Sequence, residues 1–436
     1  MKKVLSLVLA LAMVLGCMSF AAADEKGVIN VYAFTDEVPT MLQYYIDRHP
    51  EFGYTLNPTI IATTDGLYQP ALDEALKAGE VDLYCAEAAF ILKYAQGDMA
   101  EYAAAYEDLG IEVADAIKAA DIAQYTVDIG TRPADGKVVG LGYQATGGAF
   151  IYRRSIAKDV WGTDDPKEIA GKIGPGWDKF FQAAEELKAK GYGIVSGDGD
   201  IWHAIENSSE KGWLNEDGEL YIDPAREAFL DMSKKLKDNG YHNDTQDWQD
   251  PWFADMKGIG EQPIFGFYGP AWLINYTIAP NAGDTAGDWA VCEPNIGFFW
   301  GGTWLLAAKD SAKKEAVGEL INWVTLDCTE TGLQYAWANG TLEYNEAGTK
   351  DCVGSGTVMA MSDGKLDFLA GQNMFDVFVP ANQFANGKNL TQYDESINSI
   401  WRDAVRQYTS GQKTREEAIA FFKQDVEDKL GIEAAE

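Results

Sequence analysis

Strand patterns and helix patterns alternate along this chain, and the alternation limits its possible folds more than any other feature. Residues 28–34 have the pattern of a buried strand, and further strand patterns occur at 54–62, 81–86 and 263–269. Apolar residues at three-and-four spacing, typical of amphipathic helices, occur at 67–79, 177–191, 224–240, 311–325, 393–408 and 414–430. Several of these helical patterns stop at a glycine, a common helix-ending residue. Alternating strands and helices predict an α/β fold with helices packed on sheets.

Two further segments connect these elements. Residues 90–106 have a helical pattern after the strand at 81–86. A different pattern begins at 137–154, with a strand, a glycine-rich crossing and a second strand. No fixed-period repeat, low-complexity tract or long linker occurs in the sequence.

The N-terminus has the pattern of an export signal. Lys2 and Lys3 precede an apolar run that is too short to span a bilayer. Ala21-Ala22-Ala23 before Asp24 fits ordinary signal-peptidase cleavage, which predicts a signal peptide at 1–23. Val14-Leu15-Gly16-Cys17 resembles a bacterial lipobox, so the alternative is a signal at 1–16 with Cys17 lipidated. Both interpretations predict an exported protein, either extracellular or periplasmic, and the second anchors it to the outer face of the cell membrane.

The charge of the chain excludes one class of partner. Asp and Glu number 68 against 35 Lys and Arg, which gives a net charge of −33. A field of this sign repels nucleic acid and anionic membranes and favours neutral or cationic small ligands. We therefore expect no nucleic-acid partner.

The sequence contains no recognisable catalytic or metal-binding motif. The three histidines are not spaced as metal ligands are, and the motifs of phosphate-binding loops and of hydrolases are absent. Asp198 and Asp200 in the segment 196–202 could belong to a calcium loop, but a plain turn is the alternative that the spacing favours. Cys328 and Cys352 could form a disulfide, with buried free thiols as the alternative. We expect no catalytic residues, no metal and no cofactor.

The aromatic residues give the most specific functional signal. The segment Phe298–Trp304 places two tryptophans around Gly301 and Gly302, and glycines in a strand often mark the close approach of a ligand or another backbone. Trp202 and Trp272 also adjoin acidic, glycine or proline residues at loop signals. Flat aromatic faces beside carboxylates and amides suit the apolar face and hydroxyl rim of a sugar. For Trp202, Trp272 and Trp300, packing in the core is an equal alternative to sugar binding.

Six segments in sequence order resemble the extracellular solute-binding proteins of ATP-driven carbohydrate importers, the group that includes maltose-binding protein. They are 34–50, 72–102, 138–154, 174–192, 264–276 and 287–325. The last two carry Gly269-Pro270-Ala271-Trp272 and the glycine pair before a strand. Residues 244–255 and 340–368 have no clear counterpart in the family, so ligand contacts there are open.

The resemblance implies a two-lobed periplasmic-binding-protein-like fold of type II, with discontinuous lobes joined by a hinge. The first lobe would comprise 27–143 plus 303–350, and the second 147–298 plus 355–436. An oligosaccharide would bind in the cleft, and lobe closure would present it to the membrane permease subunits of an ABC importer. We expect a monomer that binds without catalysis.

The resemblance also implies a set of ligand-binding residues, most of them on loops that face the cleft. Trp300 would form one wall of the cleft, and Trp304 would belong to the core. The full predicted set is Thr35, Asp36, Glu37, Thr64, Asp65, Glu87, Gln144, Asp198, Asp200, Trp202, Tyr268, Trp272, Trp300, Gly301 and Gly302.

Two other functions are consistent with the same residues. A cationic solute such as a polyamine would suit the net acidity, because cation–π cages use the same aromatics. A secreted glycoside hydrolase would use the same platforms together with two carboxylates.

Overall fold

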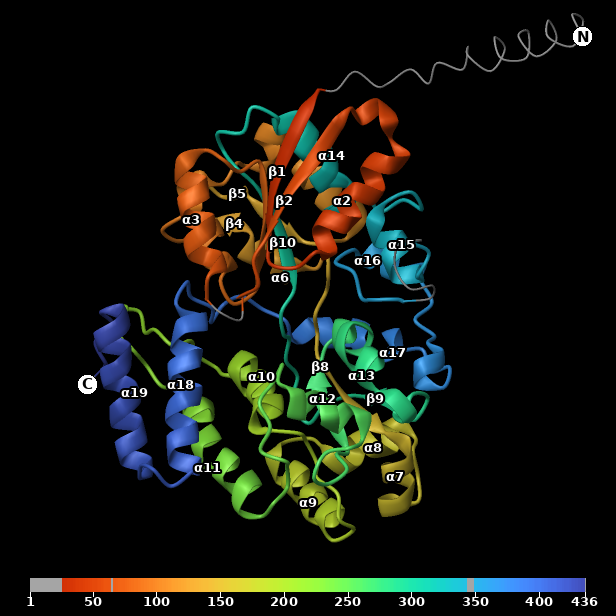
Figure 1. The fold of residues 1–436 in the computed structure, drawn as a ribbon, viewed down its shortest axis with the longest axis vertical. Helices are drawn as coiled ribbons and strands as arrows, with labels where there is room; N and C mark the ends of the chain where they lie inside the picture. The colour runs from red at the N-terminus through yellow and green to blue at the C-terminus, as the bar shows by residue number, and fades with distance from the viewer. Residues whose placement is uncertain (1–25, 64–65, 343–348, 436) are drawn as a thin grey trace, which may run out of the picture.

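The computed structural model describes residues 26–63, 66–342 and 349–435, which fold into two lobes (Figure 1). The predicted signal segment with Cys17, and the predicted ligand residues Thr64 and Asp65, lie outside the described residues. Each lobe contains a sheet flanked by helices, as the alternating pattern predicts.

The first lobe is built on a five-stranded sheet of order β2-β1-β3-β10-β6. The three N-terminal strands are parallel, and β10 pairs antiparallel with both β3 and β6. The strands are β1 (Gly27–Ala33), β2 (Tyr54–Ile60), β3 (Leu83–Glu87), β6 (Gly140–Gly142) and β10 (Thr303–Ala307).

Helices cover both faces of this sheet. Leu83 and Cys85 of β3 pack with α2 (Glu37–Arg48) and α14 (Lys314–Thr325), whereas Tyr84 and Ala86 pack with α3 (Tyr68–Ala78) and α4 (Ile91–Ala95). This division follows from the two-residue period of a strand, which points successive side chains to opposite faces. The lobe also contains α5 (Val113–Ala120), α6 (Gln124–Ile129), β4 (Thr131–Arg132), β5 (Lys137–Val138), α15 (Leu333–Asn339) and α16 (Gly356–Ala360).

One helix prediction in this lobe is too long. Within 90–106 the α-helix ends at Ala95, and two 3-10 turns follow at Ala100–Tyr102 and Tyr106–Leu109. The break falls at Gln96-Gly97-Asp98, where glycine disfavours helix and the Asp98 amide donates to the Gln392 side chain at 3.1 Å.

The second lobe is built on a three-stranded antiparallel sheet of order β8-β7-β9. Its strands are β7 (Ala149–Arg153), β8 (Gly266–Gly269) and β9 (Trp289–Cys292). Its helices are α7 (Arg154–Trp161), α8 (Pro166–Ile173), α9 (Trp177–Lys188), α10 (Asp198–Ser208), α11 (Pro224–Asp238), α12 (Asp250–Lys257), a π-helical turn (Leu273–Ile278), α13 (Ala279–Asn281), α17 (Phe375–Ala381), α18 (Asp394–Thr409) and α19 (Arg415–Leu430). The π-helical form of Leu273–Ile278 is one that occurs often at functional sites.

Chain segments between the lobes lie side by side. The segment after β6 pairs with the segment before β10, since Gly148 donates to the Phe298 carbonyl at 2.9 Å and Trp300 donates to the Thr146 carbonyl at 3.1 Å. A third segment joins them where Ala145 donates to the Cys352 carbonyl at 3.2 Å. Because α16 contacts α5 whereas α17 contacts β7, we propose that this third segment changes lobe between α16 and α17.

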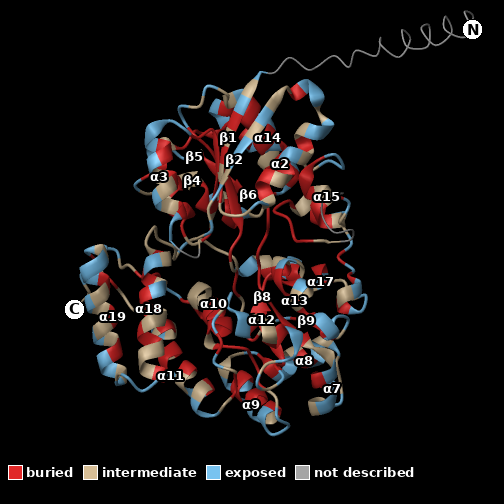
Figure 2. Ribbon diagram, in the orientation of Figure 1, coloured by how far each residue is buried: buried red, intermediate tan, exposed pale blue. Residues whose placement is uncertain are grey.

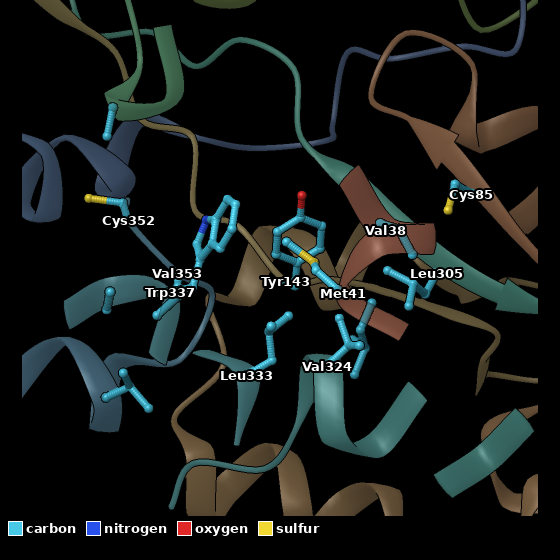
Figure 3. Packing of buried hydrophobic residues seen from close by; sticks show 14 of the residues in the cluster. Val38, Met41, Cys85, Tyr143, Leu305, Val324, Leu333, Trp337, Cys352 and Val353 are labelled. Carbon is cyan, nitrogen blue, oxygen red and sulfur yellow. The ribbon is translucent and has the colours of Figure 1, made fainter. Parts of the chain in front are cut away.

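The interior of each lobe is apolar. Most strands are buried, the edge strand β2 has no buried residue, and the outer faces of the helices are exposed (Figure 2). In the first lobe Tyr143, Trp337 and Cys352 pack near Met41 of α2 and Leu305 of β10 (Figure 3). The described cysteines are all free thiols: Cys85, Cys292, Cys328 and Cys352. Cys328 and Cys352 therefore do not form the disulfide that was one of the two alternatives. Trp304 is 1% exposed and its indole donates to the Thr126 carbonyl at 3.0 Å, which confirms its core position.

Candidate functional site

Two cavities lie between the lobes and share a wall. The first, of about 370 Å³, is lined by Glu87 of the first lobe and by His203, Glu206 and Arg402 of the second. The second, of about 390 Å³, is lined mainly from the first lobe, with Phe34, Glu37 and Gln144, and by Trp272 and Tyr276. Residues common to both are Glu87, Trp248, Trp300, Gly301 and Glu395. The two cavities therefore form adjoining parts of one cleft, which we call the cleft below.

Three tryptophans gather where the cavities meet. The Trp300 and Trp272 rings lie edge to face with centroids 4.8 Å apart, and the Trp272 indole donates to the Trp300 carbonyl at 3.3 Å. The Trp248 ring is nearly parallel to that of Trp272, at an interplanar angle of 11° and a centroid distance of 6.2 Å. None of the three is fully buried, and Trp248 is 37% exposed. They present flat apolar surface in a polar cleft, as a stacking site requires.

The glycine pair after Trp300 is required by the backbone. Gly301 has φ +69° and Gly302 φ +111°, conformations that side chains with a Cβ rarely adopt. Thr146 Oγ1 donates to the Gly301 carbonyl at 2.9 Å, and Ala88 donates to the Gly302 carbonyl at 3.2 Å. The bend itself lies beside the end of β3, since a Cβ at Gly301 would be 3.3 Å from Glu87 Oε1.

A buried charge network adjoins Trp300 and Trp248. Asp247 accepts hydrogen bonds from Arg402 Nη1 at 3.0 Å and lies 3.3 Å from His203 Nε2. The His203 ring stacks on Trp300 with centroids 3.6 Å apart. Asp247 also precedes Trp248, whose φ of +65° is uncommon for a bulky residue and indicates backbone strain. The network thus holds both rings in place.

Burial of these charges changes their proton affinity. Burial by itself raises the pKa of Asp247, but the charges of Arg402 and His203 hold it well below its usual range. Burial lowers the pKa of His203 despite its contact with Asp247. Asp247 is therefore the ionised member that pairs with Arg402.

Several other carboxyl groups of the cleft have raised pKa values. Burial, with the nearby carboxylates Asp351 and Asp36, raises the pKa of Glu37 to about 8. Burial, with Glu395 and Glu206 nearby, raises the pKa of Glu87 to about 8. Such groups are near the point of changing protonation at neutral pH, so they can donate or accept hydrogen bonds.

The structure brings most of the predicted ligand residues to the cleft. Thr35, Glu37, Gln144, Trp272 and Gly302 line the second cavity, Trp202 lines the first, and Glu87, Trp300 and Gly301 line both. Gln144 is also tied to the wall, since its Nε2 donates to Asp351 Oδ2 at 3.0 Å. Trp202 is only 1% exposed and packs against Phe229, so it belongs mainly to the core of the second lobe.

Four predicted residues lie elsewhere. Asp36 is exposed at the start of α2. Asp198 accepts a hydrogen bond from Ser233, and Asp200 accepts from the Ser196 and Gly197 amides at 3.1 and 3.0 Å. The segment 196–202 is therefore the capped start of α10, neither a calcium loop nor an isolated turn.

Tyr268 is the fourth, and it is not an exposed platform. Its side chain is fully buried among Phe150, Phe180 and Phe298, and its hydroxyl donates to Asn295 Oδ1 at 2.5 Å. The physical reason is the strand period, because Tyr268 lies on the face of β8 that packs against the helices.

Sequence reasoning missed several residues of the cleft. Trp248 lies in the segment 244–255 that has no clear family counterpart, although its Trp-rich, acidic sequence was a usable signal. Arg402, Glu395 and Glu206 lie within helices whose period predicts only which face is buried. His203 directly follows a predicted residue, but a single histidine carries no pattern.

Within the described residues, no group of three or more His, Cys, Asp or Glu side chains is arranged to hold a metal ion. None of the helices described here has the length and apolar character that crossing a membrane requires.

Comparison with known proteins identifies the relatives of this chain. The sequence model of the bacterial extracellular solute-binding proteins matches residues 51–344. No curated protein has a matching sequence. A crystal structure of an extracellular solute-binding protein of family 1 is similar with a TM-score of 0.72 and 19% identity, covering 92% of this chain and 99% of that one.

Two similar structures contain sugars. The galacto-N-biose-/lacto-N-biose I-binding protein of Bifidobacterium longum, in complex with lacto-N-biose, has a TM-score of 0.66 at 16% identity and covers 94% of this chain and 98% of its own. The transporter-associated binding protein of B. animalis subsp. lactis, in complex with β-1,6-galactobiose, has 0.64 at 20% identity and covers 92% and 97%. At these identities the similarity shows the fold, and it confirms the predicted two-lobed α/β architecture.

Proposed function

Because the chain belongs to the bacterial extracellular solute-binding proteins, we propose that it binds a saccharide of two or more units in the cleft. The bound saccharide is then delivered to the permease subunits of an ATP-driven importer. The observation that carries the proposal is the group of Trp248, Trp272 and Trp300 at the junction of the two cavities.

Stacking and hydrogen bonding divide the recognition between them. The tryptophan faces cover the apolar face of a sugar ring, each such aromatic contact contributing roughly 1–3 kcal/mol. Glu37, Glu87 and Gln144 supply carboxyl and amide groups at the rim for hydroxyls. The presence of tryptophans at the boundary of two adjoining cavities supports a ligand longer than a monosaccharide.

The lobes act as two halves of a clamp. The predicted lobes are 27–143 plus 303–350 and 147–298 plus 355–436; because α16 contacts α5 and α15, we propose that the C-terminal boundary lies after α16 instead. The three adjacent crossing segments support a hinge. Closure buries the ligand and presents the closed form to the permease. The chain works as a monomer, binds reversibly without turnover, and is exported by its N-terminal signal, with cleavage before Asp24 or lipidation at Cys17.

A thermal-shift screen of the exported form against a glycan panel tests the proposal. A ligand at 100-fold its Kd adds about 2.7 kcal/mol of stability, which a melting curve detects. Stabilisation by oligosaccharides, with the sugar recovered unchanged, supports the proposal. A panel in which no saccharide stabilises the protein contradicts it, and shortened sugars would favour a hydrolase.

One observation favours a second candidate, a cationic solute such as a polyamine. Among the described residues, no Lys or Arg forms an ion pair with Glu37 or Glu87. Unpaired carboxyls beside aromatic faces also suit an alkylammonium ligand. Putrescine and spermidine in the same screen separate this candidate from the first.

A further inference from the structure

Glu87 lines both cavities, as Glu395 does, and it also adjoins the glycine bend that follows Trp300. It ends β3, and its Oε2 accepts a hydrogen bond from the Ala89 amide at 2.8 Å. Its Oε1 lies so near Gly301 that a Cβ there would be 3.3 Å from the oxygen and 3.4 Å from the Trp272 ring. The carboxyl group therefore lies against the backbone bend that carries Trp300, close to the edge of Trp272.

Two more glutamates lie near Glu87. Glu206 accepts a hydrogen bond from Asn398, and Glu395 accepts one from Gln69. In the part of the chain that the structure describes, neither forms an ion pair with Lys or Arg. Burial raises the pKa of both, although the charges of Arg226 and Arg402 act to lower the pKa of Glu206 and that of Lys93 acts to lower the pKa of Glu395. The two arginines of the first cavity are paired elsewhere, Arg402 with Asp247 at 3.0 Å and Arg406 with Asp403 at 3.5 Å.

A fourth acid of the same cavity has an unused oxygen. Asp394 is 1% exposed and lines the first cavity. Its Oδ1 accepts from the amide and hydroxyl of Thr391 at 3.1 and 2.5 Å, but its Oδ2 has no hydrogen-bond partner among the described residues. A buried polar atom without a partner costs free energy, which a donor entering from the cavity would recover.

This distribution of charge is poorly suited to a wholly neutral ligand. Burial and the neighbouring Glu395 and Glu206 oppose ionisation of Glu87, as its raised pKa indicates. A positive charge placed among these groups would relieve their repulsion, and the adjacent indole faces attract cations as well.

We propose that the first cavity binds a protonated amino group carried by the saccharide, with Glu87 as its principal counter-ion. This inference rests on the proposed function. The saccharide class is then an amino sugar with a free amine. The ring carrying the amine stacks at Trp300, and Glu206, Glu395 and Asp394 surround the ammonium on the side of the second lobe.

Three disaccharides that share one β-1,4 skeleton test the proposal. They are the glucosamine disaccharide, its N-acetylated counterpart and cellobiose, which carry an ammonium, an amide and a hydroxyl at the same position. Calorimetric titration of the exported form at pH 6.5 measures each affinity. We expect the free amine to bind at least tenfold more tightly than the other two, with a preference that falls as salt is raised.

Glu87→Gln provides the decisive variant, since it keeps the shape but cannot ionise when an ammonium binds beside it. It should bring the ratio of the amine affinity to the cellobiose affinity close to one. Glu101→Gln, at an exposed position of the first lobe, is the matched control and should keep the ratio. Melting curves of both variants show whether each is folded.

Each result bears on one of the two proposals. Equal affinity for the three disaccharides, no binding of the free amine, or a preference that persists in Glu87→Gln overturns the amino-group proposal. Neutral saccharides of the glycan panel that bind while the amine does not leave the saccharide function in place. Binding of putrescine with no saccharide contradicts the proposed function itself.

Discussion

Replacing Trp300 with Ala separates a ligand platform from a packing residue. Trp300 is partly exposed in the cleft, where its ring stacks on His203 and contacts Trp272 and Trp248. Its removal takes one flat stacking surface away from the bound sugar. It removes only a small part of the packing that stabilises either lobe. We therefore expect a large effect on affinity and a small one on stability.

The magnitudes follow from the burial. Loss of one stacking contact should lower affinity tenfold to a hundredfold, about 1.4–2.8 kcal/mol. The free energy of unfolding should fall by about 1–2 kcal/mol, because the ring is only partly buried. Trp304→Ala is the control, since that ring is 1% exposed and its loss should cost about 3–5 kcal/mol of stability.

The assay is calorimetric titration with the best saccharide of the glycan panel, together with melting of the unliganded variants. Trp300→Phe, which keeps a smaller ring, should recover part of the affinity. A Trp300→Ala protein that melts as early as Trp304→Ala yet binds at full strength would refute the reasoning.

Three further predictions concern the charge network, pH and export. Asp247→Asn leaves Arg402 and His203 without their buried partner, so melting should show a loss of about 3–5 kcal/mol of stability and titration an affinity at least tenfold lower. The control is Asp238→Asn, which breaks an exposed pair with Lys234 and should change stability by under about 0.5 kcal/mol and leave affinity unchanged. Because the pKa values of Glu37 and Glu87 are raised to about 8, the folded chain binds more protons than the unfolded chain between pH 4.5 and 8, so stability should fall as pH rises through this window, by at most about 1.4 kcal/mol per pH unit for each group. Glu87→Gln should flatten that decline in melting curves from pH 5 to 8, and an unchanged slope would contradict the assignment. Mass spectrometry of exported protein should find an N-terminus at Asp24 or a lipidated Cys17, and an intact Met1 would exclude both.

The sequence predicts the fold well because periodicity and glycine positions are local signals. Helices such as α9, α11, α18 and α19 fall within a few residues of the patterns that predict them. The failures are also physical. Helix over 90–106 breaks at Gly97, where a contact with the distant Gln392 competes with helix.

The site is less predictable because it depends on tertiary packing. Nothing in the sequence distinguishes Tyr268, which faces the core, from Trp272, which reaches the cleft four residues later. Asp200 is a residue type that often binds ligands, but here its carboxylate caps the start of α10. Trp248 and Arg402 are 154 positions apart, and only the fold brings both to the first cavity.

A crystal structure of the exported form with the tightest-binding saccharide tests the central claim most directly. The account predicts a sugar ring stacked on Trp300 within the cleft, with Glu87 in hydrogen-bond contact with the ligand. A saccharide bound outside the cleft, or a cleft ligand that leaves Trp248, Trp272 and Trp300 untouched, would contradict it.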